Sequence, residues 1–206
     1  HFPTSFARRG ERRFNLVSSW ETFPLLYLAA GATTIRTAGA MFPQADLQLA
    51  AAIRDGRRLG PDVDVTAPRL DGPEPSLALA TYAHTVADAE RHVDLWSGQG
   101  ATSFKAFTAL RAEQLGAMVR RAHARGARVA GHRCAASFAE AAELGIDSLE
   151  HGFWWASDFV PERVPDRCDR ARLQAWRLDA RPDEPRLDAL IATLVERGVA
   201  LTSTPA

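Results

Sequence analysis

The sequence predicts an α/β fold with a parallel sheet, and three observations support this. Helical and strand-like segments alternate with a period of roughly 20 to 40 residues, which is the rhythm of consecutive β-α units. No linker-like stretch interrupts this alternation. The expected strands also end on polar residues, and Lys105, His132 and His151 each end one of them. In a parallel barrel such strand ends meet on one face, where active sites are built.

Composition excludes several classes of protein. The 206 residues include 46% hydrophobic and 24% charged side chains, so a disordered chain is excluded. No apolar run approaches the length that crosses a membrane. The 25 basic residues balance the 25 acidic ones and are scattered, which argues against nucleic acid or anionic lipid as a partner. We expect a small-molecule substrate, no nucleic-acid or membrane partner, and leave self-association to a homo-oligomer open.

The expected elements of the first half follow from apolar spacing and from the glycines and prolines between them. Helices are expected over residues 25–29, 47–53 and 86–96, and strands over residues 33–36, 63–66 and 102–107. The first helix ends at Gly31, and the second strand lies between Pro61 and Pro68.

The third quarter of the chain has the clearest pattern. Leu115, Met118, Val119 and Ala122 lie at i, i+3, i+4 and i+7, which is one face of a helix that Gly126 closes. A strand over 127–132, a short helix over 138–144 and a strand over 146–151 follow. We interpret the polar stretch 152–185 as a long connection, either a lid or an insertion. A helix over 187–194 and a last strand near 198–204 complete the pattern.

Lys105 is the only lysine of the chain, and every other basic residue is arginine. This choice favours a position that needs an amine able to lose its proton, which a guanidinium cannot do. The alternative is a surface lysine retained by chance.

Lys105, His132 and His151 are separated by 27 and 19 residues, one β-α unit each time. Each histidine alone would more often have a structural role. Two imidazoles and a deprotonatable amine at neighbouring strand ends instead suit a divalent metal. Side-chain alternation predicts that Glu150 points away from this site, toward the helical layer. Among the remaining histidines, we expect His123 at the rim. His84 and His92 are expected to be exposed.

Four segments carry a family resemblance: Gly31–Arg36, Ser103–Ala106, Val129–His132 and Leu149–Gly152. In this order they resemble segments of the metal-dependent amidohydrolase superfamily, particularly its imidazolonepropionase-like and prolidase-like members. The resemblance implies a TIM (β/α)8 barrel of the metal-dependent hydrolase type, incomplete in this chain, with about strands 2 to 7 present. Residues 1–206 would then be one catalytic barrel domain fragment.

The resemblance also implies two divalent metal ions, zinc in most relatives, bridged by a lysine that carbon dioxide has carbamylated. Lys105 matches this lysine, and His132 and His151 match the histidines after the fifth and sixth strands. His1 would match the second histidine of a His-x-His pair on the first strand. The family's catalytic aspartate follows the eighth strand, so no catalytic residue is assigned within the chain. The eighth strand and the flanking β-sandwich would lie outside it, and the fragment alone should be inactive.

The expected activity is the hydrolysis of a C–N bond in an amide, dipeptide or cyclic amide by a metal-bridging hydroxide. A deaminase of the same superfamily and a non-catalytic barrel that acts as a binding scaffold are the alternatives. Trp154 and Trp155 are candidates for the substrate pocket, or else for packing under the long connection.

The chain has two cysteines, Cys134 and Cys168, which are too few for a disulfide framework. We expect free thiols and a cytoplasmic protein, and targeting sequence upstream remains open.

Overall fold

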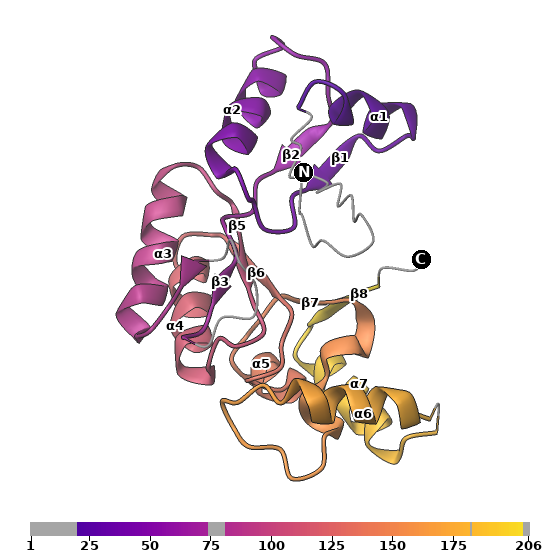
Figure 1. Ribbon diagram of the computed structural model, residues 1–206. Helices are drawn as coiled ribbons and strands as arrows, with labels where there is room; N and C mark the ends of the chain where they lie inside the picture. Colours follow the sequence, from indigo (N-terminus) through magenta and orange to yellow (C-terminus); the bar gives the residue numbers. More distant parts are fainter. Residues whose placement is uncertain (1–19, 74–80, 182, 204–206) are drawn as a thin grey trace, which may run out of the picture.

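The computed structural model describes residues 20–73, 81–181 and 183–203 (Figure 1). The strands are β1 (Thr34–Arg36), β2 (Asp62–Asp64), β3 (Leu70–Asp71), β4 (Thr81–Tyr82), β5 (Ser103–Ala106), β6 (Arg128–Gly131), β7 (Ser148–Glu150) and β8 (Ala200–Thr202). The helices are α1 (Phe23–Ala29), α2 (Pro43–Arg54), α3 (Val86–Gly98), α4 (Ala112–His123), α5 (Phe138–Glu143), α6 (Arg170–Asp179) and α7 (Pro185–Glu196). Two 3₁₀ turns, η1 (Gly152–Trp155) and η2 (Ser157–Phe159), follow β7.

All the described strands pair in parallel. One sheet has the order β4-β3-β5-β6-β7-β8, and β1 pairs with β2 beside it. Residues 62–71 connect the two sheets, because β2 pairs with β1 while Thr66 bridges to Ser103 and Leu70 pairs with Ala106. The segment therefore acts as one strand between β1 and β5. Six consecutive barrel strands result, which confirms the prediction of an incomplete parallel barrel.

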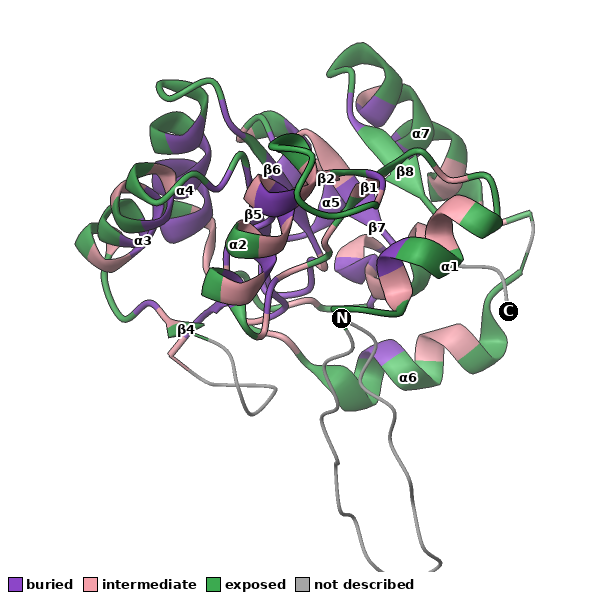
Figure 2. Cartoon of the chain, turned by 90° about the horizontal axis from the view of Figure 1, so that it is seen from above, coloured by how far each residue is buried: buried purple, intermediate pink, exposed green. Residues whose placement is uncertain are grey.

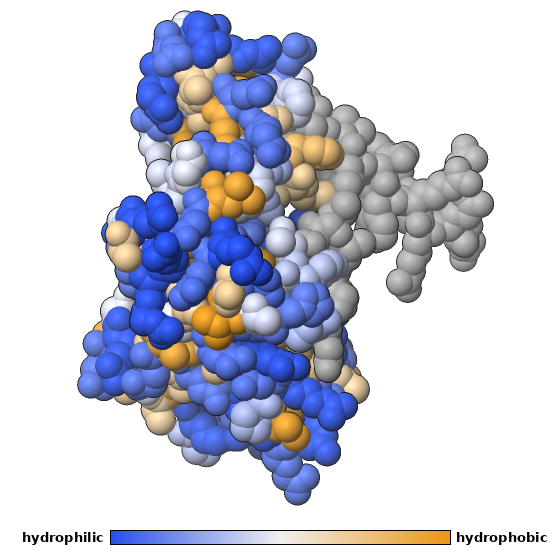
Figure 3. All heavy atoms as spheres, turned by 90° about the vertical axis from the view of Figure 1, so that its left-hand side faces the viewer, coloured by the Kyte–Doolittle hydropathy of each residue, from blue (hydrophilic) through white to orange (hydrophobic). Residues whose placement is uncertain are grey.

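Helices cover the outer face of these strands. Figure 2 shows β5, β6 and β7 buried between helices whose outward faces are exposed. The core between the layers contains Phe104 and Leu149 from the strands and Leu115 and Met118 from α4, all at 0% exposure. On the side of the molecule that carries α2, α3 and α4, hydrophilic residues dominate and apolar ones are scattered (Figure 3). Periodic burial of one helix face thus produces the two-layer arrangement.

The expected helix around residues 115–122 is confirmed as α4. Its predicted face is buried, and the chain turns at Gly126, whose φ of 70° lies in the left-handed region that glycine adopts without strain. The helix packs against α3 and against β6. Within the described residues, no helix has the length and apolar character needed to cross a membrane.

The stretch 152–185 is not a simple connection, because α6 lies within it. Asp169 caps this helix by accepting a hydrogen bond from the backbone N–H of Arg172 (3.0 Å), and Leu173 is its buried residue. The sequence did not reveal α6 because so few of its residues are apolar and buried. The short strand β4 was missed for a similar reason, since only two residues pair.

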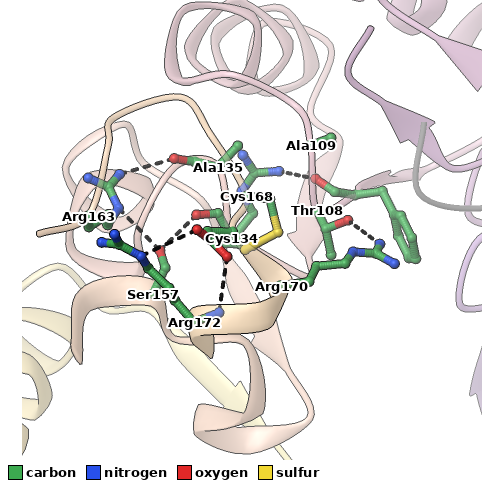
Figure 4. The surroundings of a disulfide bond; sticks show 12 residues. Thr108, Ala109, Cys134, Ala135, Ser157, Arg163, Cys168, Arg170 and Arg172 are labelled. Carbon is green, nitrogen blue, oxygen red and sulfur yellow. Dashed lines mark hydrogen bonds and ion pairs between the residues drawn. A yellow bond between two sulfur atoms is a disulfide. The ribbon is translucent and has the colours of Figure 1, made fainter. Parts of the chain in front are cut away.

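Cys134 and Cys168 form a disulfide, so the prediction of free thiols was wrong (Figure 4). The bond joins the loop after β6 to the residue before the cap of α6. Ser157 supports the loop by donating a hydrogen bond to the carbonyl oxygen of Cys134 (2.7 Å). The 34-residue separation gave no sign of this contact, because the fold of the intervening segment brings the two sulfurs together.

Candidate metal centre

The ends of β5, β6 and β7 bring Lys105, His132 and His151 together, as the sequence predicted. Lys105 pairs with Ala130 across the sheet, and the backbone N–H of His132 donates to the carbonyl of Ala106 (3.1 Å). The rings of His132 and His151 are stacked, with 4.2 Å between their centroids and 14° between their planes. Parallel register thus places groups from three successive β-α units at one end of the sheet.

Glu150 belongs to this site, and the prediction that it points toward the helical layer was wrong. Its carboxylate contacts Nζ of Lys105 and accepts a hydrogen bond from Nη2 of Arg36 (2.8 Å), and its side chain is only 8% exposed. The cause is the backbone of His151, whose φ of 68° is left-handed. Side chains stop alternating between the two faces of the strand at His151. Glu150 and His151 therefore both reach the site, while Leu149 packs in the core.

Lys105 is fully buried, and its Nζ touches Glu150 without forming a hydrogen bond. Burial lowers the pKa of Lys105 well below its ordinary value, and the nearby positive charges of Arg36 and Arg69 lower it further. The Glu150 carboxylate opposes this effect, but its charge is shared with Arg36. The site therefore favours a neutral amine at Lys105.

The two histidines are also held in their neutral form. Burial is the main cause that lowers the pKa of His132 to about 2, and the charge of Lys105 adds to it. Burial and Lys105 likewise lower the pKa of His151. A neutral imidazole keeps the lone pair that binds a metal.

The donor set fits a divalent cation. One ligand atom from each of His132, Glu150 and His151 lies within 4.8 Å of the others. Nδ1 of His132 is buried without a hydrogen-bond partner. Because buried polar atoms are almost always satisfied, a bound ligand best explains this atom.

Two aromatic residues border His132. Phe107 and Trp155 approach its ring edge-on, with centroids at 4.9 Å and 6.0 Å. Trp154 instead is 54% exposed and lies under the guanidinium of Arg177, 4.4 Å from the ring centroid. Of the two tryptophans expected at a substrate pocket, only Trp155 therefore lies beside the histidine pair.

The buried side chain of Arg133 connects two loops of the site, and no sequence pattern indicated this role. Arg133 follows His132, is 0% exposed and donates hydrogen bonds to the backbone carbonyls of Phe107 and Leu110. It thereby joins the loop after β6 to the loop after β5. This contact fixes the backbone on either side of the candidate ligands.

The other histidines of the described residues lie apart from the centre. His1 falls outside the described residues. His123 lies at the end of α4 and contacts Asp147 (3.0 Å), while His84 is exposed, as expected. His92 is 5% exposed and packs edge-on against Phe104, so the expectation of an exposed residue was wrong. The reason is that α3 packs its inward face, including His92, against β5.

Comparison with known structures finds amidohydrolases with a similar fold. A candidate prolidase from Bifidobacterium longum matches 63% of the chain at 26% identity with a TM-score of 0.56. The bottromycin amidohydrolase AH matches 82% of it at 26% identity with a TM-score of 0.57. These matches place the chain in the amidohydrolase superfamily. Another amidohydrolase, at 19% identity over 86% of the chain and a TM-score of 0.59, shares the fold.

This superfamily member spans 35%, 34% and 44% of the lengths of those three proteins. No family model matches its sequence, and the search among curated proteins found no relative.

Proposed function

We propose that the protein containing this chain is a metal-dependent hydrolase of C–N bonds, acting on an amide, dipeptide or cyclic amide. The carrying observation is the buried amine of Lys105 beside the stacked imidazoles of His132 and His151. Similarity to the bottromycin amidohydrolase and to the candidate prolidase supports the class of reaction. The chain would form one barrel domain of that enzyme.

We assign His132, His151 and Lys105 as ligands of two divalent ions, zinc by family likeness, with His1 as a further ligand. When bound, such ions lower the pKa of a coordinated water and polarise the substrate carbonyl. The imidazoles contribute their lone pairs without first losing a proton. Phe107 and Trp155 pack against the ring of His132 and limit its movement.

Lys105 would hold the metals as a carbamate. Its neutral amine attacks the carbon of carbon dioxide, so that an N–C bond forms while one C=O π bond breaks and its electron pair moves to oxygen. One proton passes from the nitrogen to solvent, which leaves the anionic carbamate. Arg36 and Arg69 favour the neutral amine before this reaction and stabilise the anion after it. Arg36 also holds the Glu150 carboxylate, which reduces its repulsion of the new charge.

We further propose that Trp155 forms an apolar wall of the substrate site. Its position beside His132 supports this role, whereas Trp154 packs with Arg177 at the surface.

The direct test is an assay of the full-length, metal-replete protein against matched amides, dipeptides and cyclic amides. We expect hydrolysis with release of the amine, and a loss of more than about a hundredfold in His132→Asn. His123→Asn is the matched control and should retain activity, because His123 lies outside the centre. Release of free ammonia from a ring substrate would indicate a deaminase instead, and no turnover of any substrate would contradict the proposal.

The carbamate has a separate test. Protein equilibrated with ¹³C-bicarbonate should show a carbamate carbon by NMR, and Lys105→Met should remove that signal. A folded wild-type protein without the signal would contradict the role of Lys105, even if the protein binds metal.

A further inference from the structure

The disulfide between Cys134 and Cys168 joins two parts of the chain that border the candidate metal centre (Figure 4). Cys134 lies two residues after His132, and Cys168 lies two residues before Arg170, the first residue of α6. The guanidinium of Arg170 lies over the ring of Trp155, 5.8 Å from its centroid, and Trp155 approaches the ring of His132 edge-on. The bond therefore fixes α6 to the loop that carries His132, on the side where Trp155 borders it.

Little apolar packing holds α6 in this position. Leu173 is the buried residue of the helix, and it packs with Cys134 and Val160 in a small cluster that is separate from the main core. Trp176 of α6 stacks on Phe159, with 4.8 Å between the ring centroids. A helix that buries so little apolar surface gains little stability from packing, so its position depends strongly on the covalent link.

A cationic side chain ties α6 to the two tryptophans before it. The guanidinium of Arg177 lies over the rings of Trp154 and Trp155, 4.4 Å and 4.8 Å from their centroids. Its Nε donates a hydrogen bond to the backbone carbonyl of Trp154 (2.6 Å). The helix and both tryptophans, which we call the α6 unit, are therefore expected to move together.

A pocket gives a small molecule access to one end of the disulfide. Cys168 is partly exposed, whereas Cys134 is only 1% exposed. Arg167 and Asp169, on either side of Cys168 in the sequence, line a pocket of about 440 Å³ together with Ser157, which donates to the carbonyl of Cys134. A water molecule occupies only about 30 Å³, so a small dithiol fits. Exposed disulfides are the ones that are readily reduced and often regulatory, whereas structural ones resist reduction.

We propose that this disulfide is a redox-sensitive switch: the oxidised bond holds the α6 unit beside the metal centre, and reduction by a dithiol releases the unit. This regulation of the metal centre rests on the proposed function, whereas the release itself does not.

The reduction is an ordinary exchange of disulfide for thiols. One thiolate of the dithiol attacks Sγ of Cys168, so that a mixed S–S bond forms while the Cys134–Cys168 bond breaks and Cys134 leaves with the electron pair. The second thiolate then attacks the sulfur of the dithiol in the mixed disulfide, which closes the dithiol to a cyclic disulfide and releases Cys168. Two electrons pass to the protein, and the two protons of the dithiol end on the two cysteines.

The first test compares hydrogen–deuterium exchange of the full-length, metal-replete protein in its oxidised form and after addition of dithiothreitol. Reduction should speed the exchange of α6 amides by about tenfold or more, while the amides of α4 stay protected. Reoxidation should restore the slow exchange. Unchanged exchange in α6, or equal acceleration in α4, would overturn the proposal. A bond that dithiothreitol reduces only after denaturation would also overturn it.

Two variants separate this bond from other effects of the reductant. Cys168→Ser should show fast exchange in α6 without dithiothreitol, and the reagent should change nothing further. A response like that of the wild type would mean that the reagent acts on another thiol or on the metal, and would overturn the proposal. Leu178→Ser is the matched control, because it alters an α6 side chain that is 77% exposed and keeps the disulfide. It should respond to dithiothreitol as the wild type does.

The effect on the metal centre is measured by the release of bound zinc to a chromogenic chelator. Oxidised wild type is compared with Cys168→Ser, so that no thiol reagent competes for the metal. Release should be about tenfold faster from the variant, because Trp155 no longer stays beside His132. Equal release rates would overturn the regulation of the centre. A protein that binds no zinc would contradict the proposed function, while the exchange experiment would still decide whether the disulfide controls α6.

Discussion

Asp71 and Gly72 hold the loop that follows the lysine strand. Oδ1 of Asp71 accepts hydrogen bonds from the backbone N–H groups of Gly72 (3.0 Å) and Ala109 (2.8 Å). At Gly72 the two loops approach so closely that an added Cβ would lie 1.9 Å from the carbonyl oxygen of Ala109. The position of the loop after β5 therefore depends on the absence of a side chain at one residue.

Gly72→Ala should lower the free energy of unfolding by about 1 to 3 kcal/mol, because backbone must move to admit the new methyl group. Gly98→Ala is the matched control, since nothing lies within 4 Å of its added Cβ at the end of α3. It should be neutral or stabilising by up to about 1 kcal/mol. Urea denaturation of both variants checks the difference, and equal stabilities would contradict the close approach.

His92 should make the fold sensitive to mild acid. Burial lowers its pKa from 6.5 to about 4, so the folded state resists its protonation. The contribution of neutral His92 to the free energy of unfolding is complete above pH 6.5. About 3 kcal/mol of this contribution is lost as the pH falls toward 4. His92→Gln should therefore reduce the decline in unfolding free energy between pH 7 and 4, while His84→Gln at the surface should not. Identical slopes for both variants would contradict the burial of a neutral His92.

The sequence could predict three residues of the site but not all of it. Lys105, His132 and His151 were found because strand ends of a parallel sheet converge. Glu150 was placed on the wrong face, because alternation assumes an extended backbone and His151 is left-handed.

At the scale of elements, α6 and the disulfide form the part of the structure that packs beside the candidate metal centre. Arg170, the first residue of α6, donates to Thr108 (3.3 Å) and lies over Trp155, 5.8 Å from its ring centroid. The disulfide between Cys134 and Cys168 links this helix to the loop that carries His132. Sequence patterns identified the helices with one long apolar face. They failed at α6, because Leu173 is its buried residue and few of its other residues are apolar.

Removing the disulfide should destabilise the domain. The bond closes a loop with a sequence separation of 34, so Cys168→Ser should cost about 2 to 4 kcal/mol of unfolding free energy. Guanidinium denaturation with and without a dithiol reductant checks this. The reductant should lower the stability of the wild type to that of the variant and leave the variant unchanged. A wild type that is insensitive to reductant after unfolding and refolding would show that no disulfide forms.

The whole molecule is a series of β-α units in which each strand joins the sheet beside the last, apart from the small β4 excursion. The fold class could be predicted from the sequence because the same β-α unit is repeated, and its repetition produces the parallel sheet. The sequence did not predict that one barrel strand is divided into β2 and β3. This division depends on tertiary pairing, since β2 pairs with β1 and β3 pairs with β5. The same repetition aligns the strand ends, so the architecture itself assembles the candidate metal centre.

The most direct test of the account is the metal content of the full-length protein, purified without chelator and measured by elemental analysis. We predict about two divalent ions per chain, as in a two-metal hydrolytic site. Lys105→Met should lose most of this metal, whereas His84→Gln should retain it. A folded wild-type protein that contains no divalent metal and takes up none on addition of zinc would contradict the central claim, and would leave Lys105, His132 and His151 as structural residues of a binding scaffold.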